Sequence, residues 1–599
     1  MAKKDRQEVI KDSDNELDHM RHSCAHMLAQ AVLQMFPEAK LGIGPTVENG
    51  FYYDFDLPRT LIPEDLDILQ KKMDEIAKEK QTFKGVESNP NEAIEFYKKA
   101  GQPYKVELIE DLKKEGEKNI TFYENLDKDG KVRFSDLCRG GHSESTRQTG
   151  AFKLTKIAGA YWRGDEERPM LQRIYGVCFK EKKDLNDYLV MMEEAKKRDH
   201  RKLGQALDLF TFSDLVGSGL PLWTPKGTLV RNLLDDFVWE MRREKGYERV
   251  TIPHITKKEL YETSGHWQKF NDELFKITSR EGHEFAMKPM NCPHHTQIYN
   301  HLPRSYKDLP QRYAETTTCY RDEQTGEIHG LSRVRAFTQD DAHVFCRTAQ
   351  VKEEFLKIWD IIDKFYATVG FGELEIRISL HDPDEMDKYL GTEELWQEAE
   401  ENLREIAKGK GKDFKEEVGE AAFYGPKVDF MTKDSIGREW QVATIQLDIN
   451  LPERFDLTCI NEKAEKERIV MIHAAIMGSI ERFMSIFLEH NFGNFPAWLA
   501  PVQARVLPIA GAHVSYGQEV YEDLKASGVR VELDDTSEGL GKKIRNAEMA
   551  KVPYILVVGE KEIADKAVAV RSRKDKGQKV MKADDFKKQI LEEIEERAL

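Results

Sequence analysis

The sequence predicts an α+β protein of several domains, in which a central antiparallel sheet is followed by a small α/β domain. At 599 residues the chain exceeds what one hydrophobic core supports, so roughly three domains are expected. Two strand-like runs, residues 319–323 and 333–343, flank a short loop and predict an antiparallel hairpin. Between residues 505 and 558, strand-like runs alternate with helical ones, which predicts the α/β domain.

Shifts in composition predict five segments along the chain. Residues 1–15 are charged and lack periodicity, so they are expected to form a flexible tail. Residues 16–197 open with apolar side chains at helical spacing and predict an N-terminal α+β domain. The basic run that follows predicts a linker helix over residues 198–210, before a central domain over 211–496 and a C-terminal domain over 497–599. The helically spaced residues are Met20, Met27, Leu28, Ala31, Val32 and Met35.

Charge and cysteine content narrow the classes of function. The formal net charge is -16, so binding of a nucleic acid would need local basic clusters such as residues 196–202 and 571–574. Seven scattered cysteines indicate reduced thiols. No apolar run has membrane-spanning length, and the N-terminus lacks a signal-peptide core. A cytoplasmic protein without a membrane partner is therefore expected.

The two strand-like runs carry side chains suited to a nucleotide. The period of two along a strand places alternate residues on one face. Guanidinium groups bind phosphate oxygens bidentately, an aromatic ring can stack on a purine, and a carboxylate can accept from its exocyclic amine. The alternative is an arginine-rich solvated strand, which would not require Phe337 and His343 in phase with the arginines. The residues predicted in phase are Arg321 with Glu323, and Arg333, Arg335, Phe337, Gln339, Asp341 and His343.

This hairpin resembles the second conserved motif of class II aminoacyl-tRNA synthetases. Two further motifs follow the order of that class: a helix-like run with a strand over residues 229–253, which forms the dimer interface in the class, and residues 478–482, where one arginine projects from a helix. Residues 287–295, 423–427 and 471–473 are similar to the threonyl-tRNA synthetase family. The resemblance runs from about Asp18 to the C-terminus. Bacterial members commonly begin with a ubiquitin-like domain, and a form lacking it is expected here.

The resemblance implies one catalytic zinc ion, held by Cys292, His343 and His473. Their wide separation in the sequence would not identify them as ligands. One thiolate and two imidazoles leave a tetrahedral zinc with an open position for substrate. Threonine offers zinc an amino and a hydroxyl group, whereas valine lacks the hydroxyl. In this scheme Asp341 accepts from the substrate hydroxyl, and Gln339 and Tyr424 hold its amino group. His294 stands where the family usually has glycine.

The same resemblance implies a site for ATP with Mg²⁺. Arg321 is expected at the α-phosphate, and Arg333 and Arg482 at the β- and γ-phosphates. Glu323 is expected to read the adenine amine while Phe337 stacks on the ring. Lys427 is expected among the catalytic residues, and Gln441, Thr444 and Gln446 match family positions that line the pocket. Because Gln441 and Gln446 differ in strand parity, either a β-bulge or separate roles must be assumed.

A second site is expected near the N-terminus. His22 and His26 are one helical turn apart, and Cys138 and His142 repeat that spacing. Such pairs could bind zinc, as in the related alanyl editing domain. The resemblance instead implies a metal-free hydrolytic editing pocket that includes Lys105 and Asp136. Editing is needed because serine lacks only one methyl group, worth about 1–3 kcal/mol of discrimination. Gly141 replaces a proline common in the family.

In the C-terminal domain, Arg545, Glu562 and Arg571 match family positions that meet anticodon bases, while Ser537 replaces an asparagine. The whole pattern implies a homodimeric ligase that joins L-threonine to tRNA(Thr) with ATP and edits seryl-tRNA(Thr), with no DNA partner. Two alternatives are a catalytically silent regulatory or RNA-binding paralogue, and a prolyl or seryl enzyme of the same class. The intact set of phosphate arginines and zinc ligands argues against the first, and the zinc ligands and editing pairs against the second.

Overall fold

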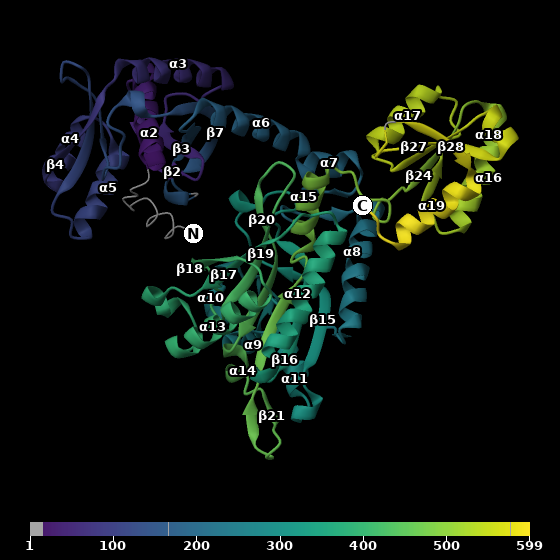
Figure 1. The fold of residues 1–599 in the computed structure, drawn as a ribbon. Coiled ribbons are helices and arrows are strands. Elements are labelled where there is room, and N and C mark those ends of the chain that lie inside the picture. The colour runs from purple at the N-terminus through teal and green to yellow at the C-terminus, as the bar shows by residue number, and fades with distance from the viewer. Residues whose placement is uncertain (1–15, 166, 576) are drawn as a thin grey trace. The chain divides into compact units, whose positions relative to one another are not determined.

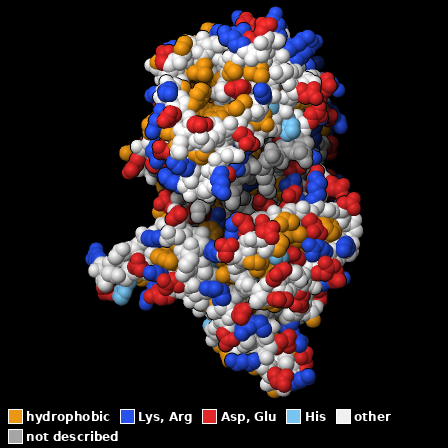
Figure 2. Space-filling model, turned by 90° about the vertical axis from the view of Figure 1, so that its left-hand side faces the viewer, with side chains coloured by type: hydrophobic (Ala, Val, Ile, Leu, Met, Phe, Trp, Pro, Cys, Tyr) orange, Lys and Arg blue, Asp and Glu red, His pale blue; other side chains and the backbone are white. Residues whose placement is uncertain are grey.

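The computed structural model describes residues 16–165, 167–575 and 577–599, which divide into two compact units between Glu193 and Glu194 (Figure 1). The tail predicted over residues 1–15 lies outside the described residues. No helix of the described segments is both long and apolar enough to cross a membrane. On the face drawn in Figure 2, acidic and basic side chains are interspersed over the surface.

The N-terminal unit begins with the helix that the sequence predicts, but the helix is not amphipathic in its middle, where residues 23–32 are all buried. Helix α2 (Glu16–Met35) buries Met27, Leu28, Ala31 and Val32 against a sheet of order β1-β3-β8-β7, with β2 paired to β3. Burial of this apolar face is what stabilises the helix. The strands are β1 (Lys40–Leu41), β2 (Thr46–Val47), β3 (Gly50–Asp56), β7 (Ala151–Tyr161) and β8 (Met170–Phe179), and α3 (Pro63–Glu79) packs beside α2.

A second, three-stranded sheet lies in the same unit. Its order is β4-β5-β6, and all pairs are antiparallel. Two antiparallel-sheet layers with helices give the α+β class that was predicted for this segment. The elements are β4 (Thr82–Ser88), β5 (Ile120–Leu126), β6 (Val132–Leu137), α4 (Pro90–Lys99) and α5 (Pro103–Lys114), and α6 (Lys182–Arg198) then leads into the next unit.

The second unit contains an eight-stranded sheet of order β11-β15-β16-β23-β20-β19-β17-β18. All neighbours are antiparallel except β11 with β15 and β17 with β18. The central antiparallel sheet is thus confirmed. Its strands are β11 (Glu248–Arg249), β15 (Gln311–Tyr320), β16 (Ala336–Cys346), β17 (Glu375–Leu380), β18 (Phe414–Val418), β19 (Lys427–Lys433), β20 (Glu439–Asp448) and β23 (Val470–Ala475).

The two faces of this sheet differ in what covers them. Ala342 and Val344 of β16 belong to the large core beneath helices α8 (Pro225–Glu244), α12 (Val351–Thr368), α13 (Glu393–Gly409) and α15 (Ile480–Asn491). The alternate residues of the strand therefore project from the opposite face, which carries the site.

The predicted hairpin needs one correction. Strands β15 and β16 pair only as far as Tyr320 with Ala336, so the segment from Arg321 to Arg335 is a loop. The Arg321 N–H still donates to the Arg335 carbonyl at 2.9 Å, but a short helix and a tight turn then occupy the loop. Four residues predicted on strand faces are therefore loop residues: Arg321, Glu323, Arg333 and Arg335.

The C-terminal part has the small α/β sheet that the sequence predicts. Its order is β25-β24-β26-β27-β28, with parallel pairing among the first three strands and antiparallel pairing beyond them. The strands are β24 (Ala504–Pro508), β25 (Val531–Leu533), β26 (Tyr554–Val558), β27 (Ala567–Ser572) and β28 (Gln578–Lys582). The helices are α16 (Val514–Ala526), α17 (Leu540–Met549), α18 (Glu560–Asp565) and α19 (Ala583–Glu595).

Candidate active site and metal centre

Three buried side chains from separate segments form a candidate metal centre. Cys292 is the first residue of α11 (Cys292–Asn300), where Pro293 in the first turn favours helix initiation. His343 on β16 lies directly opposite His473 on β23. The ligand atoms of the three residues all lie within 4.8 Å of one another. Strand register and a helix start thus bring together the three residues that the resemblance singled out.

Hydrogen bonds orient both imidazoles of this centre. His473 Nε2 lies 2.9 Å from the Asp448 carboxylate, which can only accept, so an uncharged His473 keeps its lone pair on Nδ1. His343 Nδ1 is 2.8 Å from His295 Nδ1, and its Nε2 faces His473 Nδ1 at 3.2 Å. Burial, with the nearby His473 and His295, lowers the pKa of His343 well below its usual value. Outer partners and neutral inner nitrogens are the arrangement that metal-bound histidines need.

Cys292 is the third ligand candidate, and its thiol needs a nearby cation in order to lose its proton. Burial and the carboxylates Asp341 and Asp448 raise the pKa of Cys292 well above its ordinary value. A divalent metal is the chemical means of deprotonating such a thiol. The donor set therefore fits zinc.

Sequence reasoning missed the buried neighbours of this centre. His266 Nε2 lies 3.7 Å from Cys292 Sγ, and its pKa falls to about 3 because of burial and nearby cationic groups. Together with His295 and Asp448, it surrounds the three ligand candidates. His295 lies in the same motif as Cys292 and on the same helix, α11. His266 on α10 (His266–Lys269) and Asp448 on β20 share no motif with the ligands, so only the fold reveals them. His294, the departure from the family, has a pKa lowered to about 4 by burial.

Polar groups suited to an amino acid flank the centre. Asp341, two residues before His343 on the same strand face, accepts from Asn291 Nδ2 at 2.9 Å. The Tyr424 ring stacks on His473 with centroids 4.9 Å apart, and its hydroxyl donates to Gln446 at 2.5 Å. Gln339 lies on the same face of β16, one pleat nearer the loop. Asp341 and Tyr424 thus lie beside the candidate metal centre, and Gln339 lies on the same strand face as Asp341.

The loop and helix α15 supply cations beside that face. The Arg321 guanidinium carbon lies 5.3 Å from the Phe270 ring and 5.2 Å from the Phe337 ring. Ser479 caps α15 by accepting from the Arg482 N–H at 3.3 Å, so Arg482 lies in the first turn. Burial and the positive charge of Arg333 lower the pKa of Arg482.

Glu323 and Arg333 are bonded to each other rather than separated. Arg333 forms ion pairs with Glu323 at 2.7 Å and with Glu327 at 2.9 Å. Sequence reasoning assigned Glu323 to the adenine and Arg333 to the phosphates, as two independent groups. Their pairing means that a nucleotide would have to exchange with, or extend, this contact.

A β-bulge in β20 accounts for the different strand parity of Gln441 and Gln446. The register against β19 shifts at Val442, so that Met431 faces Gln441 while Phe430 faces Ala443. Of the two alternatives that the sequence left open, a bulge or separate roles, the structure has the bulge. It lets Gln441 and Thr444 both donate to Asp429 Oδ1, at 2.6 and 2.8 Å. Lys427 forms an ion pair with the other oxygen of that carboxylate.

The N-terminal unit holds a second buried cluster, built from the two predicted pairs. Cys138 Sγ lies 3.4 Å from His22 Nε2 and 3.2 Å from His142 Nε2, and these atoms with His26 fall within 4.8 Å of one another. Burial lowers the pKa of each of the three histidines, most strongly for His26 and His142, so the rings are neutral.

A buried ion pair extends this second cluster. Lys105 Nζ lies 2.6 Å from Asp136 Oδ1, and the Tyr53 hydroxyl donates to the other carboxylate oxygen. Gly141 has φ +80°, a conformation that proline cannot adopt, so the backbone before His142 has a shape that the more common residue would exclude.

The three predicted anticodon contacts lie on separate elements. Arg545 is on α17, Glu562 on α18 and Arg571 on β27. Arg571 lies 3.6 Å from Glu548, and Glu562 accepts from the Gly559 N–H at 3.0 Å. Within the described residues, no direct contact joins the three.

Comparisons with known families agree with this architecture. Residues 275–491 match the tRNA synthetase class II core domain (G, H, P, S and T), and residues 503–593 match an anticodon binding domain. Residues 120–175 match the threonyl and alanyl tRNA synthetase second additional domain. The models thus cover the central, C-terminal and N-terminal parts of the chain.

Relatives and solved structures extend the match over most of the chain. A crystal structure of the RNA binding domain of threonyl-tRNA synthetase from Cryptosporidium parvum is 38% identical, with a TM-score of 0.62 over 66% of this chain and 98% of its own. A threonyl-tRNA synthetase structure from Aeropyrum pernix is 30% identical, with a TM-score of 0.60 over 67% of this chain and 96% of its own. Threonine–tRNA ligases of Cytophaga hutchinsonii and Bacteroides fragilis are each 48% identical over 96% of this chain and 88% of their own length. The chain therefore belongs to the threonine–tRNA ligase family of class II aminoacyl-tRNA synthetases.

Proposed function

We propose that this ligase selects its amino acid with a zinc ion held by Cys292, His343 and His473. The observation that carries the proposal is the hydrogen bonding of the two imidazoles, whose outer nitrogens meet His295 and Asp448 while their inner nitrogens face each other. When bound, zinc would supply a Lewis-acidic centre with an open position for the amino and hydroxyl groups of L-threonine. Valine has no hydroxyl to offer, so it would be rejected strongly.

The first reaction proposed is activation of threonine with ATP and Mg²⁺. A carboxylate oxygen of threonine attacks the α-phosphorus, the bond to pyrophosphate breaks, and threonyl-adenylate forms. The substrate carboxylate is already a nucleophile, so positioning and charge stabilisation suffice. Arg321 stabilises charge at the α-phosphate, and Arg333 and Arg482 bind the departing phosphates. Phe337 stacks on adenine, and Glu323, now paired with Arg333, reads its amine.

The amino-acid end and the pocket floor have proposed roles as well. Asp341 accepts from the substrate hydroxyl, while Gln339 and Tyr424 hold the amino group. Lys427, Gln441 and Thr444 converge on Asp429, and we assign them to shaping the pocket rather than to direct proton transfer. In the second reaction the terminal adenosine of tRNA(Thr) attacks the adenylate carbonyl and AMP leaves.

We further propose that the N-terminal cluster hydrolyses seryl-tRNA(Thr) without a metal. Neutral imidazoles can position and deprotonate a water next to an ester, and the Lys105–Asp136 pair supplies fixed charge beside them. The cluster would also suit zinc, since its four ligand atoms lie within 4.8 Å of one another. These atoms belong to His22, His26, Cys138 and His142. Metal analysis separates the two: about one zinc per chain supports hydrolysis by side chains alone, and about two supports a second metal site.

The remaining proposals concern partners. Arg545, Glu562 and Arg571 are suitable residue types for reading splayed anticodon bases, and the separate elements that carry them could each contact a different base. We propose a homodimer formed through α8 and β11, which correspond to the interface motif of the class, acting in the cytoplasm.

Amino-acid-dependent pyrophosphate exchange tests the proposed selection most simply. We expect exchange with threonine and weaker exchange with serine, because serine presents the same two groups to zinc. Valine and proline should give almost none. Exchange with valine approaching that with threonine would contradict a zinc-based choice, and absence of exchange with every amino acid would favour a catalytically silent paralogue.

A further inference from the structure

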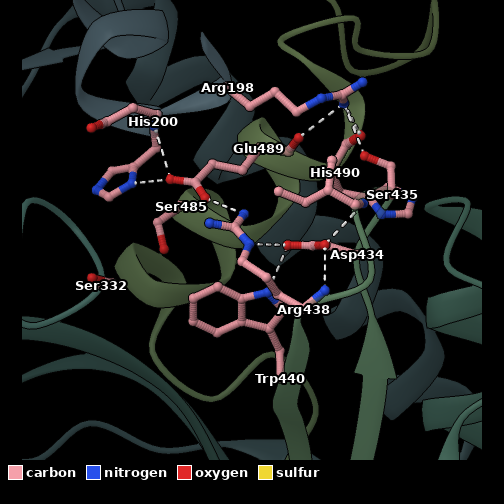
Figure 3. Close-up of polar contacts among 12 residues, drawn as sticks. Arg198, His200, Ser332, Asp434, Ser435, Arg438, Trp440, Ser485, Glu489 and His490 are labelled. Atoms are coloured by element: carbon pink, nitrogen blue, oxygen red, sulfur yellow. Dashed lines mark hydrogen bonds and ion pairs between the residues drawn. The ribbon is translucent and has the colours of Figure 1, made fainter. Parts of the chain in front are cut away.

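His200 lies far from the site residues in the sequence, yet its ring bridges two elements that carry them. Figure 3 shows its contact with Glu489. It is the first residue of α7 (His200–Ala206) and is 1% exposed. Its Nδ1 lies 2.6 Å from Glu489 Oε1, and its backbone N–H donates to the same oxygen at 3.0 Å. Its Nε2 accepts from the Leu331 N–H at 3.0 Å.

These contacts fix the protonation of the ring. A backbone N–H can only donate, so His200 Nε2 presents a lone pair to Leu331. The proton of the neutral ring is therefore on Nδ1 and is donated to Glu489. His200 thus donates a hydrogen bond to Glu489 on α15 and accepts one from Leu331 in the turn.

Each element that His200 contacts carries a proposed phosphate ligand. Glu489 lies on α15 seven residues after Arg482, two helical turns along the same face. Leu331 lies at the tip of a turn closed by the His329 N–H donating to the Arg333 carbonyl at 3.1 Å. The ring consequently ties the helix of Arg482 to the turn of Arg333.

The residues around the His200 ring pack tightly on both of its sides. Gly330 has φ +52°, and a Cβ there would lie 2.2 Å from His200 Nε2, so only glycine lets the turn approach. On the other side, Arg438 forms an ion pair with Glu489, and Arg198 donates to the carbonyls of Glu489 and His490 at 3.3 and 3.1 Å (Figure 3). Arg438 and Arg198 therefore fix the C-terminal end of α15, and the turn that contains Leu331 contacts the His200 ring.

The two arginines need such a constraint when no phosphate lies between them. Both carry positive charge, and the charge of Arg333 contributes to the lowered pKa of Arg482. Glu323 and Glu327, which pair with Arg333, offset part of the repulsion between the two arginines, and the remainder favours separation of the turn from the helix. Holding both elements beforehand reduces the reorganisation required when a polyphosphate binds.

We propose that His200 is a positioning residue for amino-acid activation, which holds the Arg333 turn against the Arg482 helix in the geometry that receives the ATP phosphates. The proposal rests on the phosphate roles of those arginines given above. The predicted linker helix over 198–210 is a shorter helix, α7, followed by a strand from Phe210, and the proposal assigns a catalytic consequence to the start of α7, outside the substrate pocket.

Two substitutions distinguish the effects of the two side-chain hydrogen bonds that His200 makes. In His200→Asn, the side-chain amide can still donate to Glu489 from near the Nδ1 position but is too short to reach Leu331. In His200→Gln, the longer side chain can offer its oxygen to the Leu331 N–H near the Nε2 position. If the turn is what matters, Gln should rescue activity that Asn loses.

A matched control exists in the same unit. His381 repeats the first half of the arrangement, with Nδ1 2.7 Å and its backbone N–H 2.9 Å from Glu400 Oε1. Its Nε2 is buried without a hydrogen-bond partner among the described residues, so it bridges to no loop. His381→Asn should therefore perturb a buried His–Glu pair without moving a phosphate arginine.

The experiment is pyrophosphate exchange with ATP and threonine varied in turn, alongside thermal unfolding and zinc content, for the parent and these variants. We expect His200→Asn to lower kcat/KM for ATP about tenfold, the scale of one lost buried hydrogen bond. The KM for threonine and the zinc content should stay at parental values. His200→Gln should recover most of the loss, and His381→Asn should leave kcat/KM for ATP unchanged.

Arg333→Ala serves as the reference for the underlying phosphate role. If Arg333→Ala lowers kcat/KM for ATP and His200→Asn does not, the positioning proposal is wrong while the nucleotide site stands. If Arg333→Ala has no effect, the phosphate assignment itself is wrong. Equal losses of ATP and threonine kinetics in His200→Asn, or equal losses in His200→Asn and His381→Asn, would show a general structural role and overturn the proposal.

Discussion

The two histidines of the metal centre are oriented by partners that strand register places beside them. His343 and His473 face each other across β16 and β23, while Asp448 arrives from β20. The resemblance to a known family could name the three ligand candidates. It could not name His266, on α10 (His266–Lys269), or Asp448, on β20, because no local sequence pattern connects the ligand candidates to partners on other elements.

Replacement of the thiol tests the metal centre. Cys292→Ser removes a ligand that only a cation makes anionic, so zinc should fall from about one per chain to near none. Threonine activation should be lost while the unfolding temperature stays close to that of Cys346→Ser, a buried cysteine of the same sheet outside the site. Metal analysis with pyrophosphate exchange measures both. Normal adenylate formation by the zinc-free variant would contradict the role given to the metal.

Arg321 tests the nucleotide face at the same scale. Arg321→Ala removes a preorganised cation held between Phe270 and Phe337, so pre-steady-state adenylation should slow by roughly 10²–10³. Binding of threonine should change less, because the contact is strongest in the transition state. Arg404→Ala, which removes a guanidinium paired with Glu416 on the surface, is the control. An unchanged adenylation rate in Arg321→Ala would remove the basis for the phosphate assignments.

Element types were predictable from local sequence, whereas loops shaped by tertiary contacts were not. Helix α2 and strand β16 lie where the sequence predicts them, although residues 23–32 of α2 are all buried and β16 is buried on both faces. The parity of two glutamines allowed either a bulge in β20 or separate roles, and the structure has the bulge. By contrast, the strands flanking Arg321 and Arg333 end earlier than predicted, because the turn at Leu331 is held by His200 from a distant segment.

The turn that carries Tyr424 gives a prediction at the scale of elements. A Cβ on Gly425 would lie 1.9 Å from the Leu447 carbonyl oxygen, so Gly425→Ala must displace the turn and with it the Tyr424 ring on His473. A shift of 1 Å can cost about 10²-fold in rate, and we expect a loss of that order in kcat/KM for threonine, with a smaller loss for ATP. Gly372→Ala, where nothing lies within 4 Å, is the control. Equal effects of the two substitutions on threonine kinetics would contradict this role of the turn.

At the scale of the whole molecule, two units each enclose a cluster of histidine and cysteine. The composition of the chain predicted several domains, and the resemblance predicted two chemistries and placed Lys105 and Asp136 in one pocket. Their direct ion pair could not be predicted, since α5 and β6 meet only in the folded unit. The central claim is a division of labour: the second unit activates threonine and, to a lesser degree, serine, and the first removes serine from tRNA(Thr).

Deacylation of preformed seryl-tRNA(Thr) tests that claim most directly. His22→Ala with His26→Ala should abolish the hydrolysis seen with the parent and with His283→Ala, an exposed histidine of the second unit. Threonylation should stay near normal, and overall discrimination against serine should fall to the roughly 10–200-fold that one missing methyl group provides. Equal hydrolysis of seryl-tRNA(Thr) by the double variant and the parent would contradict the division of labour and leave the N-terminal cluster a structural one.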